Sequence, residues 1–382
     1  MTIPTPRLAA RLSELVRIPS VSPAHGGPRA GEPGEARLAA AVEAAFRELG
    51  GETHRQEVAP GRPNVFGIWR GESHAWIGVD VHMDTVSVEQ MPGDPFSGEV
   101  KDGRVWGRGA VDTKATLAVV LALLEQVKER GARLPANLLV CATVDEEHGA
   151  TGAAAAAQWI RDRGLRLSEL AVAEPTRCRP VYAHKGVLRL EFCVRGTAAH
   201  SSQPHLGQNA ITAAAELILA MRTESRRLAA LEADGPVGLP TVTVTRVEGG
   251  RGQNVVPDEC RVSLDCRLVP GEHPAEVASR LREIAERKCP LPVETEVLKK
   301  IAPFYQDPEA PWVHRLAGWS GSAPGVAPYC TNAWAYRDVA DQCVVIGPGS
   351  IDQAHGDEEW VELSELEKLA QIYARWWGIS SG

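Results

Sequence analysis

Four apolar, strand-like runs in the sequence each end in side chains that can bind a metal ion. The runs and the residues that follow them are AWIGVDV (75–81) with His82 and Asp84, NLLVCATV (137–144) with Asp145, Glu146 and Glu147, ELAVA (169–173) with Glu174, and CVVIGPG (343–349) with His355. In an open parallel sheet, ligands bind at the shared edge formed by the carboxyl ends of the strands. We therefore expect these side chains to converge in one crevice.

The residue types predict a two-metal site. Asp112, which precedes an apolar helical segment, is a further candidate for the same rim. Histidine and carboxylate ligands without thiolate suit zinc, cobalt or manganese better than a structural zinc knot. The five ligands are His82, Asp112, Glu147, Glu174 and His355. If one aspartate bridges two ions, each ion has three protein ligands and keeps open positions for water and substrate, as hydrolysis requires.

Composition is typical of a soluble globular protein with two domains. The chain has 382 residues, of which 44% are hydrophobic and 24% charged. Its 41 basic and 49 acidic residues give a net charge of −8, which disfavours nucleic acid or an anionic membrane as a partner. There is neither a signal-like N-terminus nor an apolar run of membrane-spanning length. Eight scattered cysteines without a CxxC pair favour a reducing, cytoplasmic location.

Two kinds of periodicity predict the organisation of the chain. Strands at 64–69, 75–81, 137–144 and 169–173, with helices at 113–130 and 151–163, follow a βαβ rhythm that indicates a mostly parallel sheet flanked by helices. After Gly186 the apolar residues alternate with polar ones, and the order becomes βαββαβ, that of a ferredoxin-like sandwich. We therefore predict an α/β catalytic domain (1–185 and 301–382) with an inserted α+β domain (186–300).

Seven motifs in order also give the chain a family resemblance. They are HMDTV (82–86), GRGAVDTK (107–114), DEEHGATGA (145–153), AEPT (173–176), GTAAHSSQPHLGQNAI (196–211), QNVVPDE (253–259) and GPGSIDQAH (347–355). Together they resemble the family of acetylornithine deacetylase and succinyl-diaminopimelate desuccinylase, which includes aminoacylases and carboxypeptidases. The resemblance covers nearly the whole chain, and it implies that the inserted domain is a lid that also forms a homodimer.

The resemblance implies a role for each matching residue. One ion would be held by His82, Asp112 and Glu174, and the other by Asp112, Glu147 and His355. Asp84 would orient the imidazole of His82. Glu146 would be the general base that takes a proton from water and later gives it to the leaving amine. His200 of the partner subunit would stabilise the oxyanion. The substrate carboxylate would be bound by Lys185, Asn254, Arg267 and Thr331.

The implied reaction is hydrolysis of a small N-acyl amino acid, and N-acetyl-L-ornithine is the best single substrate because YCTNA (329–333) and GPGSIDQAH are most similar to that branch. This would assign the chain to arginine biosynthesis. One residue departs from the pattern: acetylornithine deacetylases commonly have Glu where this chain has Asn332, so a neutral side chain stays open. The alternatives are a succinyl-diaminopimelate desuccinylase, another deacylase, a carboxypeptidase or dipeptidase, and, least favoured, a non-catalytic scaffold.

Several conspicuous residues have simpler explanations. Acids at a helix N-terminus complement its dipole, which accounts for one of the three at 145–147 and leaves Asp145 unassigned. We interpret His148, His184 and His205 as residues without a direct catalytic role. Cys330 is not needed as a nucleophile where a metal activates water. Asn209 could serve as a helix N-cap.

Overall fold

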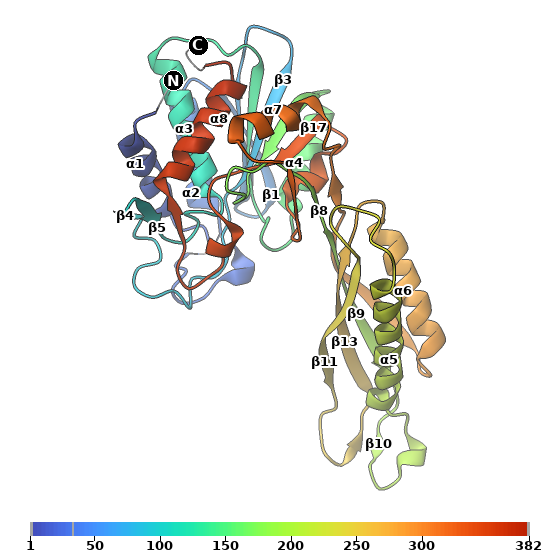
Figure 1. Cartoon of the computed structure of the whole chain (residues 1–382). Helices are drawn as coiled ribbons and strands as arrows, with labels where there is room; N and C mark the ends of the chain where they lie inside the picture. The colour runs from blue at the N-terminus through green and yellow to red at the C-terminus, as the bar shows by residue number, and fades with distance from the viewer. Residues whose placement is uncertain (1–2, 33, 380–382) are drawn as a thin grey trace. The chain divides into compact units, whose positions relative to one another are not determined.

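The computed structural model describes residues 3–32 and 34–379, which fall into two compact units. Unit 1 consists of the residues up to Tyr182, of Gln306–Gly325 and of the residues from Thr331 onward. Unit 2 consists of Ala183–Tyr305 and Val326–Cys330. The predicted inserted domain, 186–300, lies within unit 2. Figure 1 labels the helices and several of the strands.

Unit 1 is built on a sheet whose four central strands are parallel. Its strands run in the order β1 (Glu52–Ala59), β2 (Arg62–Trp69), β6 (Asn137–Thr143), β3 (Trp76–His82), β7 (Leu167–Val172), β17 (Ala340–Val345) and β8 (Val181–His184). Only the first two residues of β8 belong to unit 1. The pairs β6–β3, β3–β7 and β7–β17 are parallel, whereas β1, β2 and β8 are antiparallel to their neighbours. This confirms the predicted α/β fold with a mostly parallel sheet.

Helices cover both faces of this sheet. The helices of unit 1 are α1 (Thr5–Val16), α2 (Ala36–Glu48), α3 (Lys114–Glu129), α4 (Thr151–Asp162), α7 (Pro311–Ser320) and α8 (Leu363–Trp376). The connections β3–α3–β6 and β6–α4–β7 step across the sheet in opposite directions. Because such crossovers are right-handed, α3 and α4 lie on opposite faces. Figure 1 shows this arrangement, with α1 and α8 beside α3.

The central strands read as continuous apolar runs because they are covered on both faces. Every residue of β6 is buried, and so is every residue of β3 after Trp76. All four parallel strands end at the same edge of the sheet, so the residues that follow them come together there. The fold thereby places the predicted ligands at one edge.

A small sheet lies next to α1. It has the order β18 (Trp360–Glu362), β5 (Arg104–Trp106) and β4 (Glu99–Lys101). β4 and β5 form a hairpin, in which Asp102 (φ 51°) and Gly103 (φ 73°) both have the positive φ that a type I′ turn requires. β18 brings the C-terminal part of the chain beside the loop that carries Asp112.

Unit 2 contains the βαββαβ order that the sequence predicts. Its elements are β9 (Gly186–Arg195), β10 (Ala199–His200), α5 (Ala210–Ala229), β11 (Thr241–Gly249), β12 (Val255–Val256), β13 (Glu259–Leu268), α6 (Pro274–Lys288), β14 (Val293–Ile301) and β15 (Phe304–Tyr305). The main sheet is antiparallel in the order β11-β13-β9-β14. Buried and half-buried residues alternate along β13, because α5 and α6 pack on one face only.

The structure contains elements that the sequence patterns did not predict. β1 is a polar strand at the edge of the unit 1 sheet. It lacks the alternation of apolar and polar residues by which a strand is recognised in a sequence. Helix α7 and the short strand β16 (Gly325–Ala327) were also missed. The run CVVIGPG is a strand only as far as Val345. Within residues 3–32 and 34–379, we find no helix long and apolar enough to cross a bilayer.

Candidate metal centre

The structure brings the five predicted ligands into two groups that share one carboxylate. The ligand atoms of His82, Asp112 and Glu174 lie within 4.8 Å of one another. Those of Asp112, Glu147 and His355 form a second group of the same size. Asp112 Oδ1 lies 3.0 Å from His82 Nε2, and Asp112 Oδ2 lies 3.2 Å from His355 Nε2. A carboxylate with one oxygen toward each group has the geometry of a bridging ligand between two ions.

The charges at this edge suit divalent cations. Burial raises the pKa of Glu174 well above its usual value, and the neighbouring carboxylates of Asp112 and Glu146 raise it further. Hydrogen bonds with Asp112 and Glu147 raise the pKa of His355 to about 11. Three buried or half-buried carboxylates and two imidazoles, without thiolate, are a donor set for zinc, cobalt or manganese. Cations bound there would stabilise the ionised carboxylates and displace the imidazolium protons.

The turn after β3 sets the orientation of His82. Its Nδ1 lies 3.0 Å from the backbone carbonyl of Asp84, so Nδ1 carries the proton and Nε2 is left to face Asp112. The carboxylate of Asp84 is farther away, with Oδ1 at 3.8 Å from Nδ1. The structure thus supports this imidazole mainly through the backbone of Asp84.

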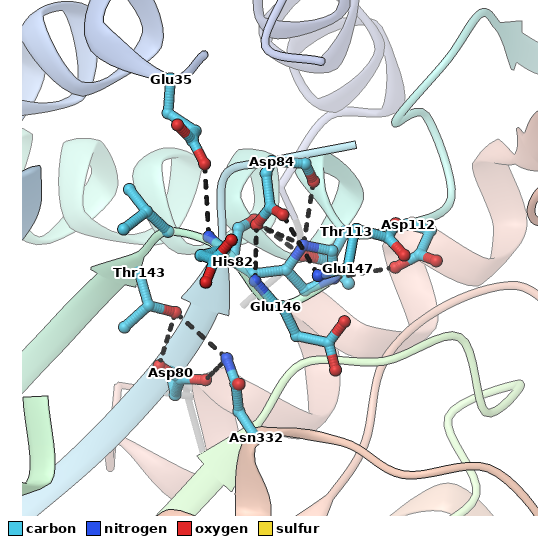
Figure 2. A network of polar contacts seen from close by, with 12 residues as sticks. Glu35, Asp80, His82, Asp84, Asp112, Thr113, Thr143, Glu146, Glu147 and Asn332 are labelled. Carbon is cyan, nitrogen blue, oxygen red and sulfur yellow. Dashed lines mark hydrogen bonds and ion pairs between the residues drawn. The ribbon is translucent and has the colours of Figure 1, made fainter. Parts of the chain in front are cut away.

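The carboxylate of Asp84 has a second set of partners. Its Oδ1 accepts a hydrogen bond from the amide of Glu146 at 3.0 Å, and its Oδ2 accepts one from the amide of Glu147 at 3.1 Å. Figure 2 shows the two amide nitrogens directed at this side chain. Asp84 therefore links the turn after β3 to the turn after β6, and it fixes the backbone of two predicted site residues at once.

Asp145, which the sequence left unassigned, stabilises the start of α4. Its backbone is left-handed (φ 65°), and its Oδ2 accepts a hydrogen bond from Thr151 Oγ1 at 2.6 Å. Its Oδ1 pairs with Arg62 at 3.1 Å, and its amide donates to the buried Glu35 at 3.2 Å. The consecutive acids therefore have different partners: Asp145 contacts the start of helix α4 and Arg62, whereas Glu147 contacts His355.

Comparison with known proteins identifies the family. The family model described as peptidase family M20/M25/M40 matches residues 78–378. The acetylornithine deacetylase of Myxococcus xanthus is 31% identical over 381 residues, which cover 97% of this chain and 96% of that protein. The chain belongs to peptidase family M20/M25/M40. It is accordingly a metal-dependent hydrolase.

Solved structures show that this family member has the fold of its relatives. A metallo-carboxypeptidase of Sulfolobus solfataricus matches with a TM-score of 0.76 at 18% identity, over 96% of this chain and 97% of that one. A Bacillus subtilis protein described as a dinuclear metal binding peptidase matches with a TM-score of 0.68 at 16% identity, over 98% and 99% of the two chains. At these identities the likeness establishes the fold.

Asn332 of this M20/M25/M40 family member is turned into the protein interior. The residue is 1% exposed, and its Nδ2 donates to Asp80 Oδ2 at 3.0 Å and to Thr143 Oγ1 at 3.2 Å. Tyr336 donates a further hydrogen bond to Asp80 at 2.7 Å. Figure 2 shows Asn332, Asp80 and Thr143 together at the end of β3 and β6. The amide that departs from the acetylornithine pattern thus serves to solvate a buried carboxylate.

The side chain of Thr331 also makes a hydrogen bond within the fold. It is 1% exposed and caps the 3₁₀ helix η3 (Asn332–Tyr336), where its Oγ1 accepts a hydrogen bond from the amide of Ala333 at 3.1 Å.

The other predicted site residues belong to unit 2. His200 is exposed on β10, and its Nδ1 accepts a hydrogen bond from the amide of Ser202 at 3.2 Å, which leaves Nε2–H as a donor. Asn254 lies beside it, since its carbonyl accepts from the amide of Ser201 at 2.9 Å. Partial burial and the charge of Arg267 lower the pKa of Lys185, so these two cations lie near each other.

Sequence reasoning missed the buried pair Arg108 and Glu359. Arg108 stands in the motif GRGAVDTK, but Glu359 lies in no motif and its nearest partners are distant in sequence. Burial raises the pKa of Glu359, although the charge of Arg108 partly opposes this. A charged residue at the start of a strand-like run was the only local signal for it.

Proposed function

We propose that the protein is a two-metal amidohydrolase that removes the acyl group from a small N-acyl amino acid, with N-acetyl-L-ornithine as the best single substrate. The observation that carries this proposal is the pair of ligand groups that share Asp112, next to the acid Glu146. The near full-length similarity to an acetylornithine deacetylase supports the choice of substrate. We infer zinc as the native metal, with cobalt or manganese as alternatives, and a cytoplasmic location.

The residues of the two groups fit the roles of ligands. His82, Asp112 and Glu174 would hold one ion, and Asp112, Glu147 and His355 the other. Two divalent cations bound there supply Lewis acidity, which polarises the amide carbonyl and lowers the pKa of an attacking water. The burial of Asp112 and Glu174, each 5% exposed, strengthens the electrostatic effect by excluding bulk water.

We assign proton transfer to Glu146. It directly precedes Glu147, and neighbouring side chains diverge, so one acid can bind a cation while the other faces the substrate. The hydrogen bonds from the amides of both residues to Asp84 hold this division in place. Glu146 would take a proton from the attacking water and pass it to the nitrogen of the leaving amine.

Unit 2 would complete the site as a lid and as the surface for a homodimer. The tautomer of His200 presents Nε2–H, which is the donor that stabilisation of an oxyanion requires. We propose that His200 acts in the site of the partner subunit, and that Lys185, Asn254, Arg267 and Thr331 bind the substrate carboxylate. Mixing His200→Ala with Glu146→Gln subunits should then restore activity through hybrid dimers. Exchange of subunits without rescue would contradict action in trans.

A second candidate substrate is an N-acyl amino acid with a neutral side chain. Asn332 carries no charge and its amide is bonded to Asp80 and Thr143, so this position provides no carboxylate for a substrate ammonium group. The desuccinylase, carboxypeptidase and dipeptidase reactions remain further alternatives within the family.

Matched substrates separate these candidates. N-acetyl-L-ornithine and N-acetyl-L-norvaline differ only by the δ-amino group, and N-succinyl-diaminopimelate and a dipeptide test the other reactions. We expect release of free amine from N-acetyl-L-ornithine in the presence of Zn²⁺ or Co²⁺. Turnover of the norvaline derivative alone would favour the neutral-substrate candidate. Release of amine from the dipeptide alone would replace the deacylase proposal, and no turnover of any substrate would contradict it.

A further inference from the structure

Two opposite charges that are far apart in sequence are buried together beside Asp112. Arg108 is 3% exposed and Glu359 is 1% exposed. Arg108 Nη1 donates to Glu359 Oε2 at 2.7 Å. Glu359 lies next to β18, and the loop that contains Arg108 follows β5, so the pairing of these two strands brings the charges together.

Glu359 binds the backbone that presents Asp112. Its Oε1 accepts hydrogen bonds from the amide of Val111 at 3.0 Å and from the amide of Asp112 at 3.2 Å. Its backbone carbonyl accepts a further bond from the amide of Gly107 at 2.9 Å. A carboxylate that receives two consecutive amides restricts the peptide between them, and with it the direction of the Asp112 side chain.

Arg108 binds the backbone of two other loops. Its Nη2 donates to the carbonyl of Gly356 at 3.1 Å, directly after His355. Its Nε donates to the carbonyl of Ser87, in the loop that follows β3, at 3.1 Å. His355 has a left-handed backbone (φ 62°), which is uncommon for a residue other than glycine and must be held by its surroundings. Arg108 therefore connects the loop of His355 to the loop after His82.

A role limited to fold stability accounts poorly for this arrangement. A buried ion pair is weak evidence for stability, because the cost of desolvation can exceed the Coulombic gain. Both side chains also bind backbone atoms: Glu359 accepts from the amides of Val111 and Asp112, and Arg108 donates to the carbonyls of Gly356 and Ser87. The same pattern occurs at Asp84, whose carboxylate accepts the amides of Glu146 and Glu147.

We propose that Arg108 and Glu359 are positioning residues that fix the backbones of Asp112 and His355, so that these two side chains and Glu147 can bind a metal ion. This inference rests on the two-metal site of the proposed function. Residues that support ligands from outside typically change metal affinity by about 10- to 100-fold when they are replaced. The pair should thus act on metal affinity more than on the fold.

The double variant Arg108→Gln/Glu359→Gln tests the proposal. It removes both charges, so neither is left unpaired in the interior, which is the main reason why a single substitution would unfold the chain. The full-length protein is freed of metal with a chelator and titrated with Zn²⁺ against a chromophoric competitor, and with Co²⁺ to record its absorption spectrum. Unfolding by urea is followed in parallel on the metal-free protein.

We expect the double variant to bind one ion about 10- to 100-fold more weakly, with an altered Co²⁺ spectrum. The affinity for the other ion should fall less, because of its three ligands only the shared Asp112 is held by the pair. Arg108→Lys is the second variant: it keeps the charge, but one ammonium group cannot reach Ser87, Gly356 and Glu359 together, so it too should weaken one ion. Glu224→Gln is the matched control, because Glu224 is 7% exposed and pairs with Arg227 in unit 2. It should change neither the metal affinity nor the Co²⁺ spectrum.

Wild-type metal affinity and an unchanged Co²⁺ spectrum in the folded variants would overturn the inference. An equal loss of affinity in Glu224→Gln would also overturn it, because the effect would then reflect general stability. Wild-type protein that binds neither Zn²⁺ nor Co²⁺ would instead overturn the proposed function itself.

Discussion

In unit 1, the carboxylates of Asp112 and Glu174 are each 5% exposed at the end of a parallel sheet, whereas the charges on the unit 2 sheet lie on its open face. Arg189 pairs there with Asp265 at 3.0 Å, and Arg261 pairs with Glu191 at 2.7 Å. Burial raises the pKa of Glu174, but a hydrogen bond from Arg195 lowers the pKa of Glu294 in unit 2. These acids of the unit 2 sheet thus have arginine partners, whereas the carboxylate of Glu174 in unit 1 lies near those of Asp112, Glu146 and Glu147.

This difference indicates where the chemistry takes place. Exposed ion pairs contribute little, because water screens both charges. Buried carboxylates that surround one another are unfavourable unless a cation joins them. The comparison therefore favours the candidate metal site in unit 1, and each of the following predictions tests this difference, in order of decreasing effect.

The largest effect is expected from Glu146→Gln. The variant should keep two metal ions per chain, because Glu146 belongs to neither ligand group, but lose about two to four orders of magnitude in kcat through loss of the general base. Metal analysis and steady-state kinetics measure both. Turnover close to that of the wild type would remove Glu146 from the mechanism.

His355→Ala should reduce the metal content from two ions to one per chain. The other group, His82, Asp112 and Glu174, does not contain His355 and should still bind. Metal analysis after dialysis, with His148→Ala as the matched control next to Glu147, measures the loss. Two tightly bound ions in His355→Ala would contradict the ligand assignment.

Asn332→Glu should destabilise the fold by roughly 3–5 kcal/mol, because it places a second carboxylate against the buried Asp80. Adding Asp80→Asn should recover much of this loss by removing the like charge. Urea unfolding of the single and double variants gives both values. A single variant as stable as the wild type would show that Asn332 can turn away from Asp80.

His184 differs from the exposed charged residues of the unit 2 sheet, because it is fully buried. Its Nε2 has no hydrogen-bond partner within the described residues. Burial lowers its pKa from 6.5 to about 4. The unfolded chain therefore binds a proton between pH 6.5 and 4 that the folded chain does not, so stability falls as the pH is lowered through this range, by about 3 kcal/mol in total. His184→Gln should show a flatter pH dependence in urea unfolding without metal. Identical pH profiles would rule out this contribution.

The smallest effect is expected for the exposed pair Arg189–Asp265. Arg189 is 48% exposed, so the coupling energy from a double-mutant cycle should be below about 1 kcal/mol. A coupling of several kcal/mol would mean that exposed ion pairs of unit 2 stabilise this protein as strongly as buried ones, which would contradict the comparison.

Much of the architecture could be predicted because its signals are local. The strands predicted at 75–81 and 137–144 match β3 and β6 to within one residue, and the helix predicted at 113–130 matches α3 equally well. Asn209 is the N-cap of α5, where it accepts a hydrogen bond from the amide of Thr212. β1 was missed because an exposed edge strand needs no apolar face.

The candidate site also contains residues that the sequence could predict and contacts that it could not. The side chains that follow a buried strand can be recognised in the sequence, because the apolar run ends where they begin. The partner of Arg108 could not be predicted, because Glu359 meets it only when β18 pairs with β5. For the same reason the bonds between Asn332 and Asp80 had no signal in the sequence.

The sequence by itself determined the order of the elements and the residue types at the strand ends, because both follow from the periodicity of short segments. Only the tertiary structure decided which atoms meet: Asp84 with the amides of Glu146 and Glu147, and Asp145 with Thr151 and Arg62. Hydrogen bonds are directional over a few ångströms, whereas a hydrophobic pattern specifies only a face. The role of Asp145, which the sequence left unassigned, could therefore be recognised only after the strands had been placed side by side.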